Sequence, residues 1–592
     1  MADRGNLFNN VKLRKPKTNG FNMNYQLLTT GNMGDLIPIT CQEVIPGDIW
    51  RGRSEVFCRL MPMLRPIMQR VDIYTHYFFV PNRLLWNISK QKNSWQAFIT
   101  GGEDGKQTPE PPNFVMSSQN ILGVINELPG AFDVCSLWDY FGLPTKSDSE
   151  LNSLFSGQTI GTNEKILLYP FLAYQLIYDE YYRDQNYTES ILDSENMQGG
   201  SYPVSNVVDL FTLRKRSWKK DYFTSALPNA QRGEPVEFSL LGEAPVSGRF
   251  NTQVSGIVRL NGFDYVGSDS EPFPDSAGGL FLRSKYIDYP DSSSLVLGAT
   301  PQGDFDEFRH GVVSGYTELS GSGVLDEGVS VDLRNVSALN VQTLREGLRL
   351  QEWLERNSVG GARYVEQIYS HFGVMVPDAT IQRPIYLGGG KQTIRISEVL
   401  QAVDEESAPL GDMAGHGISV GRTHGFNNRK FTEHGFIIGI VSVVPKASYM
   451  NGLSRMWTRL DKLDYYFPEF AHLGEQEVKI KELVFKWSKN INSLISSNRN
   501  DDTFGYQSRY AEYKYNEDRI SGEFRTTLKD WHLGRDFSTQ FDNNADFLEI
   551  QPQETERIFA VQDNGATSKL LFQIYHEFDA IRPMPKFATP YI

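Results

Sequence analysis

Alternation of apolar and polar residues predicts several strands in this chain of 592 residues. VDIYTHYFFVP (71–81) is aromatic and β-branched and ends at a proline, which is typical of a buried strand. DLIPITCQEVIPGD (35–48) has an apolar run bounded by Pro and Gly, so we expect a strand and then a turn at residues 46–48. Three later apolar runs, separated by long polar loops, are also predicted strands: IRISEVLQAV (394–403), GFIIGIVSVV (435–444) and VKIKELVFKW (478–487).

Three other segments fit a helix better. In YPFLAYQLIYDEYYRD (169–184), Pro170 suits a first helical turn, and Leu172 and Leu176 fall on one face. LNVQTLREGLRLQEWLERN (339–357) has similar spacing, and residues 82–100 contain the apolar residues of a third helix. No strand–helix–strand alternation is present, so a parallel sheet is not expected. The expected fold class is all-β dominated, a sandwich or jelly roll with long interstrand insertions that contain several helices.

Charge is distributed unevenly along the chain, which has a net charge of −14. Residues 236–332 contain five Lys and Arg against fifteen Asp and Glu, and are rich in Gly and Ser. This composition predicts an inserted, solvent-facing module. We therefore expect a basic N-terminal arm, a first part of the body, an acidic solvent-facing insertion, and a second part of the body with a C-terminal extension: residues 1–35, 36–235, 236–332 and 333–592.

Cysteine usage and hydropathy exclude several classes. Cys41, Cys58 and Cys135 show no CxxC spacing, so we expect buried free thiols in a protein made in a reducing cytoplasm. The N-terminus lacks the apolar segment of a signal peptide. The longest apolar run, residues 435–445, is about half of a membrane span and is therefore expected to be a buried strand. No membrane association is expected.

Motifs that resemble catalytic or metal-binding sites are weak. GISVG (417–421) formally matches GxSxG, with Ser419 as nucleophile, but it lies in a Gly/His/Asn segment that we expect to be a loop with no helix after it. LGGGKQT (387–393) lacks the first Gly and the Ser or Thr of a phosphate-binding loop. The histidines at 416, 424 and 434 have no metal-ligand spacing. We expect no enzyme activity, no catalytic residue, no cofactor and no metal.

Two basic segments are candidates for DNA contact. The cations of the arm, Lys12, Arg14, Lys15 and Lys17, can reach phosphates without reading sequence. LRKRSWKK (213–220) surrounds an aromatic ring with cations, a pattern that suits single-stranded nucleic acid. Its candidates are Arg214, Lys215, Arg216, Trp218, Lys219 and Lys220. The alternative, which the sequence leaves open, is an ordinary basic surface with Trp218 in the core.

Ten blocks, in order, resemble one family. They are IPGD (45–48), FFVPNRLLW (78–86), WKKDYFTSALPNAQRG (218–233), LREGLRLQEWLERNSVGGARYVEQIYSHFGV (344–374), PDATIQRPIYLGG (377–389), FTEHGFIIG (431–439), YMNGLSRMW (449–457), YYFPEFAHLGEQEV (465–478), YQSRYAEYKY (506–515) and GEFR (522–525). Together the blocks resemble the major capsid protein of the Microviridae, small icosahedral phages with circular single-stranded DNA, and its gokushovirus-like branch in particular.

The resemblance implies a single eight-stranded antiparallel jelly roll and pentamers that assemble into a T=1 shell in the bacterial host cytoplasm. It also implies a virion with packaged single-stranded DNA, a small basic DNA-packaging protein and a pilot or minor capsid protein. Residues 236–332 lie where the family has a surface protrusion at the threefold axis, a candidate for contact with a host receptor. In such a shell the basic arm, residues 1–35, is expected to be internal.

Subunit interfaces favour aromatic residues and Arg, which makes these residues interface candidates: Asp221, Tyr222, Phe223, Arg363, Tyr364, Tyr506, Arg509 and Tyr510. Two alternatives remain open from the residues alone. One is a trimeric or pentameric spike or receptor-binding protein of similar β architecture. The other is a β-sandwich glycan hydrolase with paired carboxylates.

Overall fold

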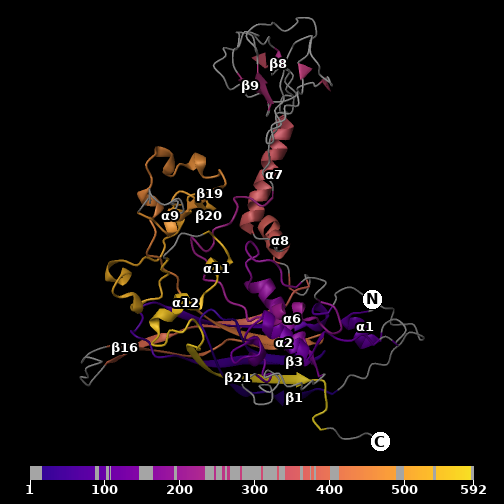
Figure 1. Ribbon diagram of the computed structural model, residues 1–592. Coiled ribbons are helices and arrows are strands. Elements are labelled where there is room, and N and C mark those ends of the chain that lie inside the picture. Colours follow the sequence, from indigo (N-terminus) through magenta and orange to yellow (C-terminus); the bar gives the residue numbers. More distant parts are fainter. Residues whose placement is uncertain are drawn as a thin grey trace. The chain divides into compact units, whose positions relative to one another are not determined.

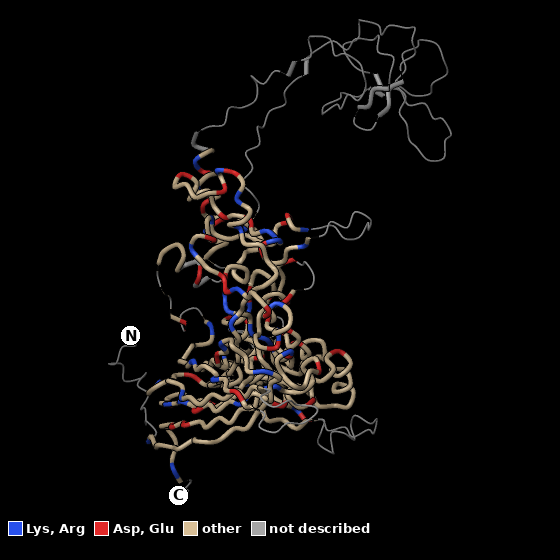
Figure 2. Tube along the Cα trace, turned by 90° about the vertical axis from the view of Figure 1, so that its left-hand side faces the viewer, with Lys and Arg blue, Asp and Glu red and all other residues tan. Residues whose placement is uncertain are grey.

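The computed structural model describes most of the chain, in two units. The described residues are 17–86, 93–101, 106, 108–145, 164–192, 197–233, 341–360, 364–373, 375, 377–378, 382–400, 413–487, 499–537 and 542–587, together with six short strands between 246 and 331. The larger unit comprises residues 1–235 and 351–592, and the smaller comprises residues 236–350. In Figure 2, acidic and basic residues are interspersed along the described chain of the larger unit.

The smaller unit contains three antiparallel pairs of short strands: β8 (Val246–Ser247) with β13 (Ser330–Val331), β9 (Ile257–Leu260) with β10 (Phe263–Val266), and β11 (Phe281–Leu282) with β12 (Arg309–His310). Helix α7 (Val341–Gly360) begins in this unit and ends in the larger one.

The larger unit is built on two antiparallel sheets. One has four strands in the order β14 (Ile385–Thr393), β5 (Val71–Pro81), β18 (Gly435–Pro445) and β3 (Ile37–Val44). All eleven residues of β18 are buried, because this strand lies inside the sheet and is covered on both faces. The long apolar run of the sequence is therefore a central strand, as predicted.

The other sheet has seven strands. Its main path is β1 (Asn19–Asn22), β21 (Leu570–Arg582), β4 (Ile49–Leu60), β16 (Met413–Arg422) and β15 (Arg395–Leu400). β2 (Tyr25–Gly31) extends the β1 position beside β21, and β17 (Phe426–Lys430) extends the β16 position beside β4. Residues 19–31, which we expected in the N-terminal arm, are thus paired in this sheet.

The two sheets pack face to face around apolar side chains. β4 and β21 alternate strictly between buried and more exposed residues, so each presents one face to the core. Part of the buried set from β4 and β21 shares one cluster with Ile37, Ile73 and Val443 of the other sheet, and another part shares a second cluster with Tyr77, Phe79 and Ile437. The structure is therefore strand-rich and antiparallel, with the two layers of a β-sandwich.

Helices cover the outer face of the four-stranded sheet (Figure 1). They are α2 (Ser118–Glu127), α3 (Leu137–Tyr140), α5 (Tyr169–Ile177) and α6 (Val204–Phe211), and α5 continues as a π-helical turn at Tyr178–Tyr182. Their apolar side chains form one cluster with Phe78, Phe436 and Ile438 of the sheet. This layer explains why β18 is buried on both faces.

A fourth apolar cluster lies at the end of β18. It joins Trp218 and Phe223 to residues of the strand pair β19 (Glu475–Lys479) and β20 (Thr503–Ser508), and of α9 (Ile480–Leu483) and α11 (Ala545–Leu548). The remaining described helices and strands are α1 (Trp95–Thr100), β6 (Asn113–Val115), β7 (Lys165–Leu167), α8 (Tyr364–Phe372), α10 (Ala511–Lys514), α12 (Pro552–Thr555) and several 3-10 turns.

Two expected elements were wrong in part. Residues 82–100 form only a 3-10 turn at Asn82–Leu84 and the short α1, with 87–92 outside the described residues. The predicted strand 478–487 turns into α9 after Lys479, because the Glu482 carboxylate accepts the Lys479 N–H (3.0 Å) and fixes a helical turn.

The GISVG segment is not a loop but the strand β16. Its glycines face the core at positions where neighbouring groups leave no room for a side chain. A Cβ on Gly415 would lie 2.6 Å from the Arg65 carbonyl oxygen, and one on Gly417 would lie 2.3 Å from Leu60. Glycine is required here by close packing rather than by a turn.

Candidate functional site

The basic segment 213–220 is held between two parts of the chain. The backbone N–H of Arg216 donates to the carbonyl of Gly34 (2.6 Å), and the N–H of Trp218 donates to that of Leu548 (2.8 Å). In return, the carbonyl of Arg216 accepts the N–H of Ile550 (3.1 Å). Backbone groups on both sides are therefore satisfied by the subunit itself, and the segment is part of its wall.

Two of the predicted DNA-contact cations are bonded inside the subunit. Arg214 donates from Nε to Gln175 Oε1 (2.8 Å). Arg216 donates to Ser442 Oγ (2.7 Å), and its guanidinium lies 4.2 Å from the ring centre of Tyr74. Burial lowers the pKa of Arg216. Both side chains contribute to packing beneath the surface.

Trp218 lies in the core. It is 2% exposed, and its indole N–H donates to Glu554 Oε2 (3.2 Å). The guanidinium of Arg535, itself 1% exposed, lies 5.0 Å from the indole ring. Of the two alternatives left open by the sequence, this burial favours the core over base stacking.

The other cations of the segment lie nearer the surface. Lys215 Nζ donates to Gln551 Oε1 (2.8 Å), and Lys219 is exposed. Lys220 is also exposed, with its Nζ 2.5 Å from Asp184 Oδ2. In the arm, Lys17 is exposed, whereas Lys12, Arg14 and Lys15 lie outside the described residues.

The candidate interface residues 221–223 form a turn that packs within the subunit. Asp221 Oδ1 accepts the N–H groups of Phe223 (3.0 Å) and Thr224 (2.8 Å), which fixes the turn. Tyr222 is buried and its hydroxyl donates to Glu482 Oε2 (3.0 Å), while Phe223 is 1% exposed. Within the subunit, these residues anchor the turn at 221–223.

The remaining interface candidates differ in exposure. Tyr506 exchanges backbone hydrogen bonds of 2.8 Å with Leu227. Tyr510 is buried with φ +61°, and the guanidinium of Arg509 lies 5.1 Å from its ring. Arg363 and the side chain of Tyr364 lie outside the described residues.

The most exposed apolar surface lies elsewhere. We define the 456–473 patch as Met456, Trp457, Leu460, Leu463, Tyr465, Tyr466, Phe467 and Leu473. Leu460 is 94% exposed and Trp457 is 67% exposed. Soluble monomers rarely expose so many neighbouring large apolar side chains, and such a group marks an interaction site. This surface was not predicted from the sequence, although two family-like blocks cover part of it.

An ion pair and a ring contact join this patch to α10. Arg459 donates to Glu512 Oε1 (3.2 Å), and its guanidinium lies 4.0 Å from the Tyr513 ring. Three successive 3-10 turns, Arg455–Trp457, Lys462–Asp464 and Pro468–Phe470, give the chain its shape here. The patch is thus a fixed surface rather than a loose loop.

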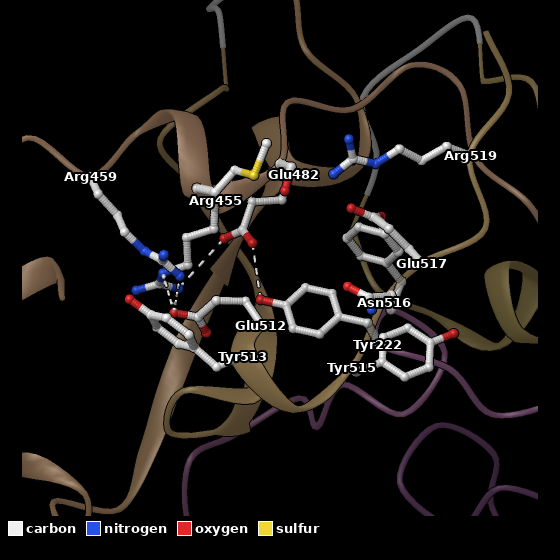
Figure 3. Close-up of a pocket in the computed structure, with 13 residues that line it drawn as sticks. Tyr222, Arg455, Arg459, Glu482, Glu512, Tyr513, Tyr515, Asn516, Glu517 and Arg519 are labelled. Atoms are coloured by element: carbon white, nitrogen blue, oxygen red, sulfur yellow. Dashed lines mark hydrogen bonds and ion pairs between the residues drawn. The ribbon is translucent and has the colours of Figure 1, made fainter. Parts of the chain in front are cut away.

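A pocket of about 410 Å³ adjoins the patch (Figure 3). Carboxylates and arginines alternate on its wall, and Arg455 lies 3.6 Å from Glu482 and 3.8 Å from Glu512. Burial raises the pKa of Glu482 and of Glu517. Within the described part of the chain, no group of three or more His, Cys, Asp or Glu is placed to hold a metal ion. The mixed charges suit a polar side chain from a partner.

The motifs that resemble catalytic sites lie in strands. Ser419 is 3% exposed within β16, and its hydroxyl donates to the Thr393 carbonyl (3.2 Å). The glycines of LGGGKQT lie in β14 rather than before a helix. His434 packs against Trp95, with ring centres 5.6 Å apart. None of these is the strand–turn–helix arrangement that a nucleophile elbow or a phosphate-binding loop requires.

No described helix is long and apolar enough to cross a membrane.

Comparison with known proteins relates the chain to phage shells over nearly its whole length. A family model described as "Capsid protein (F protein)" matches residues 10–592. "Capsid protein VP1" of Chlamydia phage 1 is 32% identical over 99% of this chain and 97% of the relative. Proteins of the same name from Bdellovibrio phage phiMH2K and Spiroplasma virus 4 are 29% and 27% identical over 96% and 94% of this chain, and over 94% and 92% of their own lengths.

These matches confirm the resemblance to microvirus capsid proteins and assign a structural rather than an enzymatic role. The chain belongs to the phage capsid protein (F protein) family and is a major capsid protein, a component of the virion.

Proposed function

We propose that this chain assembles through pentamers into a T=1 icosahedral shell around a circular single-stranded DNA genome. The observation that carries the proposal is the 456–473 patch, which exposes large apolar side chains on an anchored surface. A symmetric assembly needs surfaces that match other copies of the same chain. Interfaces of this kind are rich in Tyr, Trp and Arg, and the patch with its adjoining pocket has this composition.

The wall of the shell is proposed to be an eight-stranded jelly roll. Strand order supports this assignment: β2, β21, β4 and β16 are neighbours in one sheet, and β3, β18, β5 and β14 in the other. Successive strands along the chain cross between the two sheets from β2 to β5 and again from β14 to β21. This order is that of two interleaved Greek keys.

We assign DNA contact to the arm and to the exposed lysines. Lys12, Arg14, Lys15 and Lys17, with Lys219 and Lys220, are the candidates that are exposed or lie in the arm. A small basic DNA-packaging protein is proposed to supply further positive charge, and a pilot or minor capsid protein completes the virion. Residues 236–332 are proposed as the protrusion at the threefold axis and as the surface for a host receptor, because their fifteen carboxylates favour solvent.

Sedimentation velocity of the full-length protein tests the proposal, with negative-stain imaging of any fast fraction. The expected result is pentamers that close into shells when single-stranded DNA and the other virion proteins are added. Leu460→Asp and Trp457→Ser should remove most of the fast fraction, because each places a polar group in the contact. Leu460→Met keeps the apolar area and should assemble normally.

A discrete trimer that never assembles further would overturn the proposal and favour the spike alternative. Wild-type assembly by Leu460→Asp together with Trp457→Ser would show that the 456–473 patch is not a subunit contact. Val134→Asp is the matched control, since Val134 is 59% exposed outside the patch.

A further inference from the structure

The outward face of the seven-stranded sheet is the uncovered side of the sandwich. Among the described residues, the helices pack on the four-stranded sheet, and β21 and β1 lie on the far side of the sandwich from α2 and α6 (Figure 1). The outward side chains are accordingly exposed: Leu28 of β2 by 72%, Val420 of β16 by 75%, and Tyr575 of β21 by 40%. The side chains of such a face contact either solvent or a partner molecule.

The net charge of this face is positive, whereas the net charge of the whole chain is negative. Pairing registers and alternation place six cations outward, namely Arg51, Arg53, Arg59, Arg395, Arg422 and Lys430. Three carboxylates share the face, namely Glu55, Glu577 and Asp579. Six positive and three negative charges leave a local balance of +3, in a chain whose net charge is −14.

Several of these cations lack a partner. Arg53 pairs with Glu577, and Arg422 pairs with both Glu577 and Glu55. In contrast, Arg51, Arg59 and Arg395 form no ion pair or side-chain hydrogen bond with any described residue. Burying such guanidiniums against a surface without negative charge would leave them unpaired, which is costly. Phosphate oxygens supply the missing partner in a geometry that suits Arg.

Aromatic side chains lie among the cations. The guanidinium of Arg59 lies 5.9 Å from the ring centre of Phe57. In register beside Phe57 are Val420 on one side and Gln573 on the other, and Tyr575 is the next outward residue of β21. Two outward rings with arginines on the same face would let bases stack while phosphates meet guanidiniums.

We infer that the outward face of the seven-stranded sheet binds the packaged single-stranded DNA through its backbone. Arg51, Arg59 and Arg395 neutralise phosphates, and Phe57 and Tyr575 stack bases. Binding is independent of base sequence, because the face carries arginines and rings but no fixed pattern of donors and acceptors. The inference rests on the proposed shell, and it adds a surface that was absent from the basic segments predicted from the sequence.

The test is fluorescence anisotropy of a labelled poly-dT oligonucleotide with the full-length protein at several salt concentrations. The triple variant Arg51→Gln, Arg59→Gln and Arg395→Gln should bind about tenfold more weakly or worse at low salt. The slope of log affinity against log salt should become shallower by about 2, since each single-strand phosphate contact contributes about 0.7. Phe57→Ala should weaken binding without changing the slope, because stacking releases no counterions.

The matched control removes three cations elsewhere in the larger unit. Lys165→Gln, Arg356→Gln and Lys529→Gln change side chains that are 52%, 50% and 39% exposed, and should leave affinity and slope unchanged. Equal weakening by the two triple variants, or none by either, would overturn the inference. So would a sheet variant that binds DNA normally but no longer assembles, because the face would then be a protein contact.

Sedimentation of the same samples separates the inference from the proposed function. If the wild-type protein never closes into shells while the sheet variant loses DNA binding, the proposed shell fails and the DNA face stands. If shells form from the sheet variant with a normal DNA content per particle, the inference fails and the shell stands.

Discussion

The hydroxyl of Tyr449 donates a hydrogen bond of 2.7 Å to Asp221 Oδ2. Asp221 Oδ1 meanwhile accepts two backbone N–H groups of its own turn, from Phe223 and Thr224. One carboxylate therefore joins the turn after the basic segment to the chain that leaves β18. Most of the long insertions lie between residues 221 and 449 in the sequence. This hydrogen bond therefore helps to hold two distant segments together.

Replacing Asp221 should destabilise the subunit. Asp221→Ala leaves the 6% exposed Tyr449 without its acceptor and frees two turn N–H groups, which should cost about 2 kcal/mol. Asp221→Asn keeps one acceptor oxygen for the turn and places an NH2 that can donate to the Tyr449 hydroxyl, so it should cost less, and Tyr449→Phe should cost about 1 kcal/mol. The urea midpoint of the full-length protein measures all three. Equal midpoints for the Ala and Asn variants would contradict this role.

A side chain at Gly415 should also be costly. The Cβ of Gly415→Ala would lie 2.6 Å from the Arg65 carbonyl oxygen and 2.8 Å from Pro66 Cα, both backbone atoms that cannot rotate away. Overpacking of this kind costs about 1–3 kcal/mol. Gly20→Ala is the control, because Gly20 is also in a strand but has nothing within 4 Å of the added Cβ. The midpoint of thermal unfolding should fall for the first variant only.

Strands with continuous apolar runs could be predicted from the sequence, whereas the glycine-rich ones could not. β5 and β18 were predicted because their β-branched and aromatic residues favour a buried strand in any context. β16 has no such residues at its inward positions, and its stability comes from pairing with β4 and from close packing of Leu60 and Pro66. Those neighbours are distant in sequence, so local pattern predicted a loop.

The sequence could not separate the two alternatives for Trp218. Cations around an aromatic ring are expected both at a DNA-binding surface and in a core where an arginine packs against the ring. Its partners Glu554 and Arg535 lie more than 300 residues away in the chain, and only the fold brings them together. The exposure of the 456–473 patch could not be predicted from the sequence either, because aromatic residues are as common in protein cores as at interfaces.

Arg535 should contribute strongly to the stability of the fourth cluster. It is 1% exposed, pairs with Glu554 at 3.0 Å and donates to the Phe547 carbonyl at 2.8 Å. Arg535→Met removes these bonds and should cost about 2 kcal/mol, since it leaves the partly buried Glu554 carboxylate and the Phe547 carbonyl without their donor. Arg535→Lys keeps the charge and should cost less. Equal chemical denaturation midpoints for Arg535→Met and Arg535→Lys would contradict this expectation.

Trp218→Phe provides a second measure of the same cluster. It removes the indole donor to Glu554 and should lower stability by about 1 kcal/mol. Because the ring is buried, the loss should be the same with and without a saturating single-stranded oligonucleotide. A variant whose only defect is weaker DNA binding would restore the base-stacking alternative.

Two buried titratable groups, His576 and Asp35, should make the stability of the subunit depend on pH. His576 is fully buried, with Nδ1 2.7 Å from Ser54 Oγ and Nε2 3.0 Å from the Ile39 carbonyl, and burial lowers its pKa from 6.5 to about 4. Asp35 is also buried, and burial raises its pKa from 3.8 to about 6. The two shifts act on stability in opposite directions over nearly the same range.

Stability from neutral His576 should be complete above pH 6.5 and lost as the pH falls toward 4, because only the unfolded chain binds the proton there. The loss approaches about 3 kcal/mol at full shift. Asp35 contributes stability that is complete below pH 3.8 and lost as the pH rises through 6. Urea midpoints at several pH values should therefore rise less steeply with pH for His576→Gln and more steeply for Asp35→Asn than for the wild type. Parallel curves for the three proteins between pH 4 and 6.5 would show that neither group titrates with folding.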